Sequence, residues 1–151
     1  MQRMMALKIR EAVREDLEQL LELYTQLNEN DMPAFDRRLE EVWEKILSDA
    51  DHHIIVGSVD DRIVSSCVIA VIPNLTHGQR PYALVENVIT CGAHRGKGYA
   101  TQLLDFARQI AVKENCYKIM LLTGSKEEST LDFYRKAGYN SNDKTAFIQW
   151  L

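Results

Sequence analysis

Cysteine is scarce in this chain, and the few cysteines are not arranged for a disulfide framework or a metal site. Cys67, Cys91 and Cys116 are odd in number, form no CxxC pair and lack metal-ligand spacing. This pattern predicts reduced thiols in a cytoplasmic protein, each acting as a small hydrophobic side chain. His52 and His53 are adjacent and would point to opposite faces of a strand, so they do not predict a shared metal. No metal cofactor is expected.

Long apolar runs and an excess of basic charge are also absent. The sequence has no apolar run of about 18 residues and no recognisable secretory leader, so we expect neither a membrane-spanning nor an exported protein. The net charge of −4, without a basic tail, argues against nucleic-acid binding. There are no repeats, linkers or low-complexity segments. A composition of 46% apolar and 26% charged residues then predicts one globular domain over residues 1–151.

Hydrophobic periodicity predicts a mixed α/β domain. Apolar residues at helical spacing predict helices over residues 15–27, 35–47, 99–115 and 127–137, with Asp36 capping the second. Apolar runs with the period of strands predict strands at residues 7–9, 53–59, 62–72, 82–90, 117–123 and 146–151. Asp60-Asp61 is expected to form a hairpin turn, and AFIQWL at the end is expected to form an edge strand.

Residues 85–104 carry the strongest functional signal, because a β-branched strand runs into a basic, glycine-rich turn and then a helix. Open N–H groups at a helix start, preceded by Arg95 and Lys97, favour a phosphate group. A P-loop is excluded, since no GxxxxGK followed by Ser or Thr occurs. The dinucleotide fingerprint fits poorly, because Thr101 stands where its third glycine belongs. The remaining pattern is R-x-x-G-x-A, formed by Arg95, Gly98 and Ala100.

This motif resembles the acetyl-CoA-binding motif of the GNAT superfamily of N-acetyltransferases, Q/R-x-x-G-x-G/A. The segment FYRKAGY at residues 133–139 is similar to the family's FYxKxGF segment, and the order of elements matches over nearly the whole chain. The resemblance implies one mostly antiparallel central sheet of six to seven strands with about four helices. It also implies that the fourth and fifth strands splay apart to admit coenzyme A.

The resemblance implies a set of contacts to acetyl-CoA, the expected co-substrate. Backbone groups of the strand would pair with the pantetheine arm, and the turn and helix start would bind the pyrophosphate. An amide at Val88 would donate to the developing oxyanion. The cofactor-binding residues implied are Val88, Ile89, Thr90, Arg95, Gly96, Lys97, Gly98, Tyr99, Ala100 and Thr101.

Two side chains are candidates for proton transfer. Strict alternation puts Glu86 on one face with Leu84 and Val88, where it faces a cleft or is buried at a cost. A carboxylate in a cleft can take the proton that an ammonium must lose before it attacks a thioester, and Glu86 aligns with an acidic residue of the family. An orienting or structural role for Glu86 stays open. Tyr134 matches the family tyrosine that protonates the departing thiolate.

One departure from the family pattern bears on the cofactor. Many members have an asparagine six or seven residues before the tyrosine, where this chain has Glu127 and Glu128. Ser125 or Lys126 could replace that contact. The departure keeps open a non-catalytic acyl-CoA-binding or sensor domain, the alternative to an acetyltransferase that acts directly in a ternary complex.

The acceptor is less well indicated than the cofactor. Acidic residues could attract a cationic amine, while residues of the 73–81 loop and the strand after it could line an edge of the pocket or suit a phosphate or carboxylate. The candidates are Glu29, Asp31, Asp36, His77, Gln79, Arg80 and Tyr82. The acidic balance favours a small-molecule amine over a protein. Dimerisation is common in the family, so the resemblance implies a homodimer to which AFIQWL contributes. A terminal strand buried within a monomer is the alternative reading of AFIQWL.

Overall fold

The computed structural model describes residues 6–28 and 30–151. The chain divides into two compact units, Met1–Met120 and Leu121–Leu151, and each is described by itself. Within the described residues, no helix is long and apolar enough to cross a membrane.

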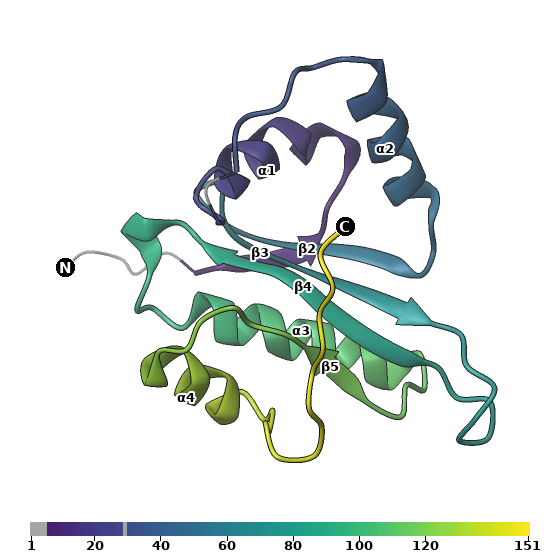
Figure 1. Ribbon diagram of the computed structural model, residues 1–151. Helices are drawn as coiled ribbons and strands as arrows, with labels where there is room; N and C mark the ends of the chain where they lie inside the picture. Colours follow the sequence, from purple (N-terminus) through teal and green to yellow (C-terminus); the bar gives the residue numbers. More distant parts are fainter. Residues whose placement is uncertain (1–5, 29) are drawn as a thin grey trace. The chain divides into compact units, whose positions relative to one another are not determined.

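The first unit is built on a sheet with the strand order β1-β2-β3-β4-β5 (Figure 1). The strands are β1 (Lys8–Glu11), β2 (His52–Val59), β3 (Arg62–Ile72), β4 (Tyr82–Thr90) and β5 (Ile119–Leu121). The first four strands pair antiparallel, each with its neighbour in sequence. The last residue of β5 belongs to the second unit.

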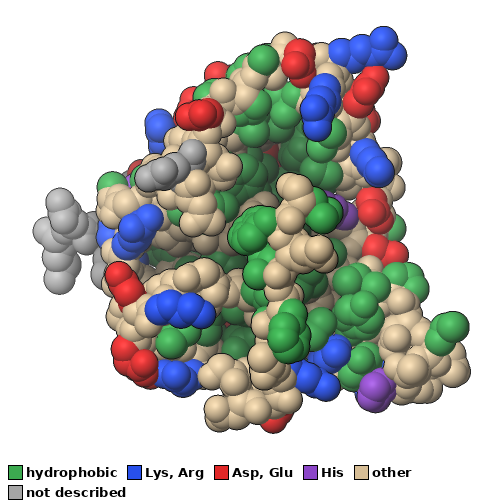
Figure 2. Space-filling model, in the orientation of Figure 1, with side chains coloured by type: hydrophobic (Ala, Val, Ile, Leu, Met, Phe, Trp, Pro, Cys, Tyr) green, Lys and Arg blue, Asp and Glu red, His purple; other side chains and the backbone are tan. Residues whose placement is uncertain are grey.

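Helices cover both faces of this sheet. Figure 1 shows α1 (Leu17–Tyr24) and α2 (Arg37–Ser48) on one face and α3 (Tyr99–Lys113) on the other. Two short 3-10 helices, η1 (Arg14–Asp16) and η2 (Gly92–His94), precede α1 and α3. Leu20 of α1, Trp43 of α2 and Val68 of β3 share one buried cluster, while Leu103 of α3 is fully buried. Figure 2 shows acidic and basic side chains mixed along the outer surface of α2, which includes the Arg37–Glu41 ion pair.

Most of the predicted elements are confirmed. Asp36 caps α2, since its carboxylate accepts a hydrogen bond from the Leu39 amide at 3.0 Å. Asp60 and Asp61 have φ angles of 51° and 60°, the left-handed pair that a tight hairpin turn needs. His52 and His53 pair with Ala70 and Ile69 and therefore lie on opposite faces of the sheet, as expected.

The number of strands expected from the sequence is wrong. Among the residues that the structure describes, the sheet has five strands rather than six to seven, and AFIQWL, at residues 146–151, is not a strand. Its apolar side chains are not buried, with Phe147 92% and Trp150 86% exposed. A strand exists through pairing with a neighbour, and apolar alternation alone does not supply that partner.

The second unit contains one helix, α4 (Glu128–Lys136). The Arg135 guanidinium reaches back along the helix to Glu128 at 2.6 Å. The helix ends at Lys136, and Gly138 follows as the predicted stop, with a φ of 102° that other residues rarely adopt. Residues 140–151 are exposed and carry no helix or strand.

Candidate active site

The turn between β4 and α3 is open at its glycines. Gly96 and Gly98 have φ angles of 76° and 78°, and a Cβ added at either would meet nothing within 4 Å. The first bond of α3 runs from the Gln102 amide to the Gly98 carbonyl, so the amides of residues 99–101 precede the helix's own hydrogen-bond ladder. These N–H groups and the helix dipole favour an anion here.

Arg95 adds a positive charge to this turn. Its side chain is exposed, and its Nε donates to the Thr90 carbonyl at 3.2 Å, which holds the guanidinium beside the end of β4. Lys97 is exposed as well. Two cations, open backbone amides and space at both glycines are what a pyrophosphate requires, so the residues present fit that group of coenzyme A.

The turn is also tied to α1 through residues that the motif does not include. The Gln26 side chain accepts a hydrogen bond from the Gly92 amide at 2.9 Å and donates to the Cys91 sulfur at 3.6 Å. The backbone amide of Ala93 and then Gln26 hold the pKa of the Cys91 thiol below its usual range. Sequence reasoning missed Gln26, which no local pattern singles out.

A β-bulge in β4 shapes the region around Glu86. Glu86 pairs with Val68 and Ile89 pairs with Ser66, so the single residue Cys67 on β3 stands opposite two residues on β4. Asn87, in the bulge, has a φ of 51°. Side chains from Glu86 to Ile89 therefore do not alternate strictly between the two faces of the sheet. The expectation that Glu86 and Val88 share a face does not hold.

Glu86 lies on the face of the sheet that α1 and α2 cover. Its partner Val68 belongs to the core cluster of these helices, and directly paired residues share a face. Glu86 and Asn87 are exposed, unlike Val85 and Ile89, which are buried. Glu86 thus has access to a substrate. The bulge was missed by sequence reasoning, although an asparagine inside a β-branched strand was its signal.

The backbone of the β4 end is partly engaged within the protein. The Ile89 carbonyl accepts from the Ser65 hydroxyl at 3.1 Å, and the Thr90 carbonyl accepts from Arg95. Each carbonyl oxygen keeps a second lone pair for another donor. Val88 lies in the bulge, where ladder pairing is interrupted.

The second unit holds the other predicted catalytic side chain. Tyr134 is half-buried in α4, with its ring edge-on to Phe133 at 4.9 Å and to Tyr139 at 6.4 Å between centroids. The Tyr139 amide donates to the Tyr134 carbonyl at 3.1 Å. Ser125 accepts from the Glu127 amide at 3.2 Å and so helps to start this helix.

Several residues suggested for the acceptor pocket have structural partners. Asp36 caps α2, as described above. Arg80 donates to the carbonyls of Asn115 and Cys116 at 3.1 and 3.0 Å, which fastens the 73–81 loop to the end of α3.

Two of the remaining acceptor candidates, His77 and Tyr82, lie in an aromatic group around Tyr117. His77 stacks on Tyr117 at 3.9 Å, and the Lys118 ammonium lies 5.3 Å from the Tyr82 ring centroid. The Gln79 side chain donates to the Leu75 carbonyl. Asp31 is exposed, and Glu29 lies outside the described residues.

No metal-binding group is found in the part of the chain that the structure describes, where no three or more His, Cys, Asp or Glu side chains are placed to hold an ion. The three cysteines are free thiols. Burial raises the pKa of the Cys67 thiol to about 12.

Comparison with known proteins gives consistent results. A curated glucosamine 6-phosphate N-acetyltransferase of Trypanosoma brucei brucei is 30% identical over 83 residues, which is 55% of this chain. The match spans about half, 54%, of that relative's length. A solved structure described as an acetyltransferase of Agrobacterium tumefaciens str. C58 is 35% identical, with a TM-score of 0.87 over 95% of this chain and 99% of the other.

A third relative has the same fold at lower identity. The crystal structure of glucosamine-6-phosphate N-acetyltransferase from Arabidopsis thaliana has a TM-score of 0.84 at 22% identity, over 96% of this chain and 98% of the other. The sequence model of the acetyltransferase (GNAT) family matches residues 14–139, which run from η1 through β4, the glycine turn and α4. The chain belongs to the GNAT family of acetyltransferases.

Proposed function

We propose that this chain is a single acetyltransferase domain over residues 1–151 that moves the acetyl group of acetyl-CoA directly to a primary amine of a small molecule. The observation that carries the proposal is the open glycine turn at the start of α3, one strand end away from the exposed Glu86. The relatives named as acting on a sugar amine support a small acceptor over a protein.

The proposed cofactor contacts follow β4 and the turn. The amides of residues 96–101 and the Arg95 guanidinium would bind the pyrophosphate, with Lys97 adding charge. β4 has nine residues and β5 has three, so the larger part of β4 extends beyond strand pairing with β5. The backbone of Val88, Ile89 and Thr90 would pair there with the pantetheine arm. We also propose that β4 and β5 splay apart to admit this arm.

The proposed chemistry uses two protein side chains. The Glu86 carboxylate takes the proton of the substrate ammonium, directly or through water. The neutral amine nitrogen then bonds to the thioester carbonyl carbon, whose oxygen gains negative charge beside the Val88 amide. The carbon–sulfur bond breaks and the Tyr134 hydroxyl gives its proton to the thiolate. The nitrogen loses its surplus proton to solvent as the amide forms, and solvent returns a proton to the Tyr134 oxygen.

The test is a panel of small amines with acetyl-CoA, read by free thiol release and by the mass of the acetylated products. We expect Glu86→Gln to lower kcat by about a hundredfold or more, the usual scale of general-base catalysis. Tyr134→Phe should lower kcat at neutral pH with little change in coenzyme A affinity. Glu18→Gln makes the same chemical change as Glu86→Gln at an exposed position of α1 and should leave kcat near the wild-type value.

Each outcome of this experiment has a distinct meaning. Coenzyme A binding without thiol release on any amine would identify an acyl-CoA-binding domain instead of an enzyme. Unchanged turnover in Tyr134→Phe, with the chemical step rate-limiting, would remove Tyr134 from the mechanism. Glu86→Gln with normal kcat but a raised KM would give Glu86 an orienting role.

Two further properties belong to the proposal. The three free thiols favour a reducing compartment, so we propose a cytoplasmic location. We also propose a homodimer, supported by the exposed apolar side chains of residues 146–151.

A further inference from the structure

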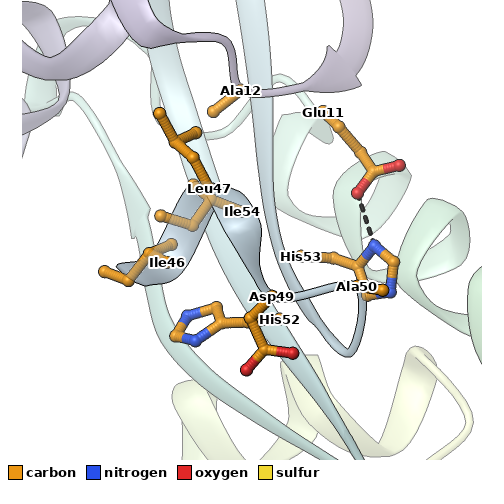
Figure 3. Close-up of a pocket in the computed structure, with 9 residues that line it drawn as sticks. All are labelled: Glu11, Ala12, Ile46, Leu47, Asp49, Ala50, His52, His53 and Ile54. Carbon is orange, nitrogen blue, oxygen red and sulfur yellow. Dashed lines mark hydrogen bonds and ion pairs between the residues drawn. The ribbon is translucent and has the colours of Figure 1, made fainter. Parts of the chain in front are cut away.

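A half-open cavity of about 280 Å³ lies between α2 and the start of β2. Apolar walls come from α2, from the end of β1 and from β2. Glu11, Ala12, Ile46, Leu47, Asp49, Ala50, His52, His53 and Ile54 line it (Figure 3). All nine residues belong to the first unit. Its volume is close to the lower limit of small-molecule sites, so it fits part of a ligand rather than a whole cofactor.

Strand register connects this cavity to Glu86. Ile54, which lines the cavity, pairs with Val68, and Val68 pairs with Glu86. The three residues form one row across the sheet, with their side chains on the face of α1 and α2. Neighbouring strands are about 4.8 Å apart, so the row places Glu86 about 10 Å from the cavity wall.

The sheet face between the cavity and Glu86 is not fully covered by other residues. In the next row, His52 pairs with Ala70, which pairs with Leu84, and all three are only half-buried. This row begins in the cavity and ends beside Glu86. A ligand lying on the sheet can therefore reach from one to the other.

The charges in the cavity determine which ligand suits it. Its ionisable residues are Glu11, Asp49, His52 and His53, with no lysine or arginine among the nine. His52 and His53 lie on opposite faces of the sheet, so only His52 is on the face of Ile54. In Figure 3 the Glu11 carboxylate turns toward His53, whose Nδ1 it contacts, while Asp49 lies near His52. Asp49 accepts a hydrogen bond from the Asp51 amide at 2.9 Å, and no described lysine, arginine or histidine is within ion-pair distance of its carboxylate. Its charge is uncompensated and exposed at the cavity mouth.

We propose that the cavity binds the non-reacting end of the acceptor, and that this end carries a second positive charge. The inference rests on the proposed function and specifies its substrate class: a flexible diamine or polyamine whose two nitrogens can stand at least about 10 Å apart. One amine is acetylated beside Glu86, the second ammonium binds at Asp49, and the methylene chain between them lies over Ile54 and its neighbours.

The test compares linear diamines, from diaminoethane to diaminooctane, with monoamines of equal length. For the longer diamines, kcat/KM should exceed that of the matched monoamine by about two- to fivefold, the scale of an ion pair with an exposed carboxylate. Asp49→Asn keeps the acceptor for the Asp51 amide but removes the charge, and should abolish this preference. Asp60→Asn, an equal charge change in the β2–β3 turn, should retain it.

A second variant and a binding measurement make the test independent of turnover. Ala50→Leu fills the cavity mouth and should weaken the binding of long diamines more than that of short monoamines. Titration calorimetry of diaminooctane should show tighter binding to the wild type than to Asp49→Asn, whether or not acetylation occurs. Equal affinity of the two proteins, or a diamine preference that survives Asp49→Asn, would overturn the inference. Acetylation of amines without any diamine preference would overturn it and leave the proposed function standing.

Discussion

A single buried carboxylate joins the first strand to the first helix. Asp16 is 5% exposed, and Arg10 donates to its two oxygens at 2.6 and 3.0 Å. The same carboxylate accepts from the Val13 amide at 2.8 Å. Its position at the start of α1 gives it one role, since a negative charge is favourable at a helix N-terminus. Its second role is structural, because one carboxylate accepts hydrogen bonds from both the Arg10 guanidinium and the Val13 amide.

We predict that Asp16→Asn destabilises the protein in a pH-dependent way. The hydrogen bonds from Arg10, first, and from Val13 hold the pKa of Asp16 below its usual range. The unfolded chain binds this proton more readily, so the stabilisation is present above about pH 4, the unfolded pKa, and is lost as pH falls through the folded pKa. At pH 7 the loss should be about 1–2 kcal/mol, near the lower part of the range because Arg10 is half exposed.

Urea unfolding at pH 7 and at about pH 3 measures this effect. The difference between Asp16→Asn and the wild type should shrink at the lower pH. Asp31→Asn removes an exposed carboxylate and should change stability little at either pH. A difference that stays constant with pH would assign the effect to packing instead of charge.

At the scale of elements, periodicity was sufficient where an element has its own amphipathic pattern or turn chemistry. The two N-terminal helices, the hairpin at Asp60-Asp61 and the stop at Gly138 follow from local residues. The prediction was less accurate for strands, because their existence and length depend on pairing with a neighbouring strand. The strand expected at residues 117–123 is three residues long, Ile119–Leu121, and AFIQWL has no ladder. The ends of strands depend on which neighbours are available, and a local pattern does not contain that information.

The candidate site divides in the same way. The motif located the glycine turn, since its function depends on local backbone freedom. It did not locate the cavity beside α2, which is assembled from two segments far apart in sequence, residues 11–12 and 46–54, nor the Gln26 contact to the turn. The β4 bulge was an intermediate case, because Asn87 was visible but the register that makes it a bulge was not.

The bulge yields a prediction for β4. Asn87 has a φ of 51°, which glycine adopts freely and which costs a β-branched residue about 1–2 kcal/mol. Asn87→Val should therefore lower the free energy of unfolding by about that amount, while Asn87→Gly stays close to the wild type. Because the bulge sets the register of Glu86, Asn87→Val should also reduce kcat/KM for the amine more than Asn87→Gly does.

Chemical unfolding and steady-state kinetics on the two variants check this. The pair is matched, because both remove the amide side chain and only one opposes the backbone conformation. Equal losses in both variants would mean that the Asn87 side chain makes the important contacts, and the bulge argument would be wrong.

At the scale of the whole molecule, the exposed apolar segment at residues 146–151 is the feature that bears on assembly. Phe147, Ile148, Trp150 and Leu151 are 92%, 67%, 86% and 117% exposed. So many large apolar side chains within six residues are unusual for the surface of a monomer. The proposed homodimer gives them a surface to bury, since a two-fold interface brings the same segment of both copies to one contact.

We predict that replacing Phe147 and Trp150 together by serine raises the dimer dissociation constant by about a hundredfold or more. Burial of each aromatic side chain contributes about 1.5–3 kcal/mol, and every tenfold change in affinity corresponds to about 1.4 kcal/mol. Sedimentation velocity over a concentration series measures the constant. Leu75→Ser removes an apolar side chain that is 87% exposed in the β3–β4 loop and should leave it unchanged. A wild type that stays monomeric at about 100 μM, a concentration at which a standard interface would be occupied, would contradict the dimer, whereas a dimer unaffected by the double substitution would place its interface elsewhere.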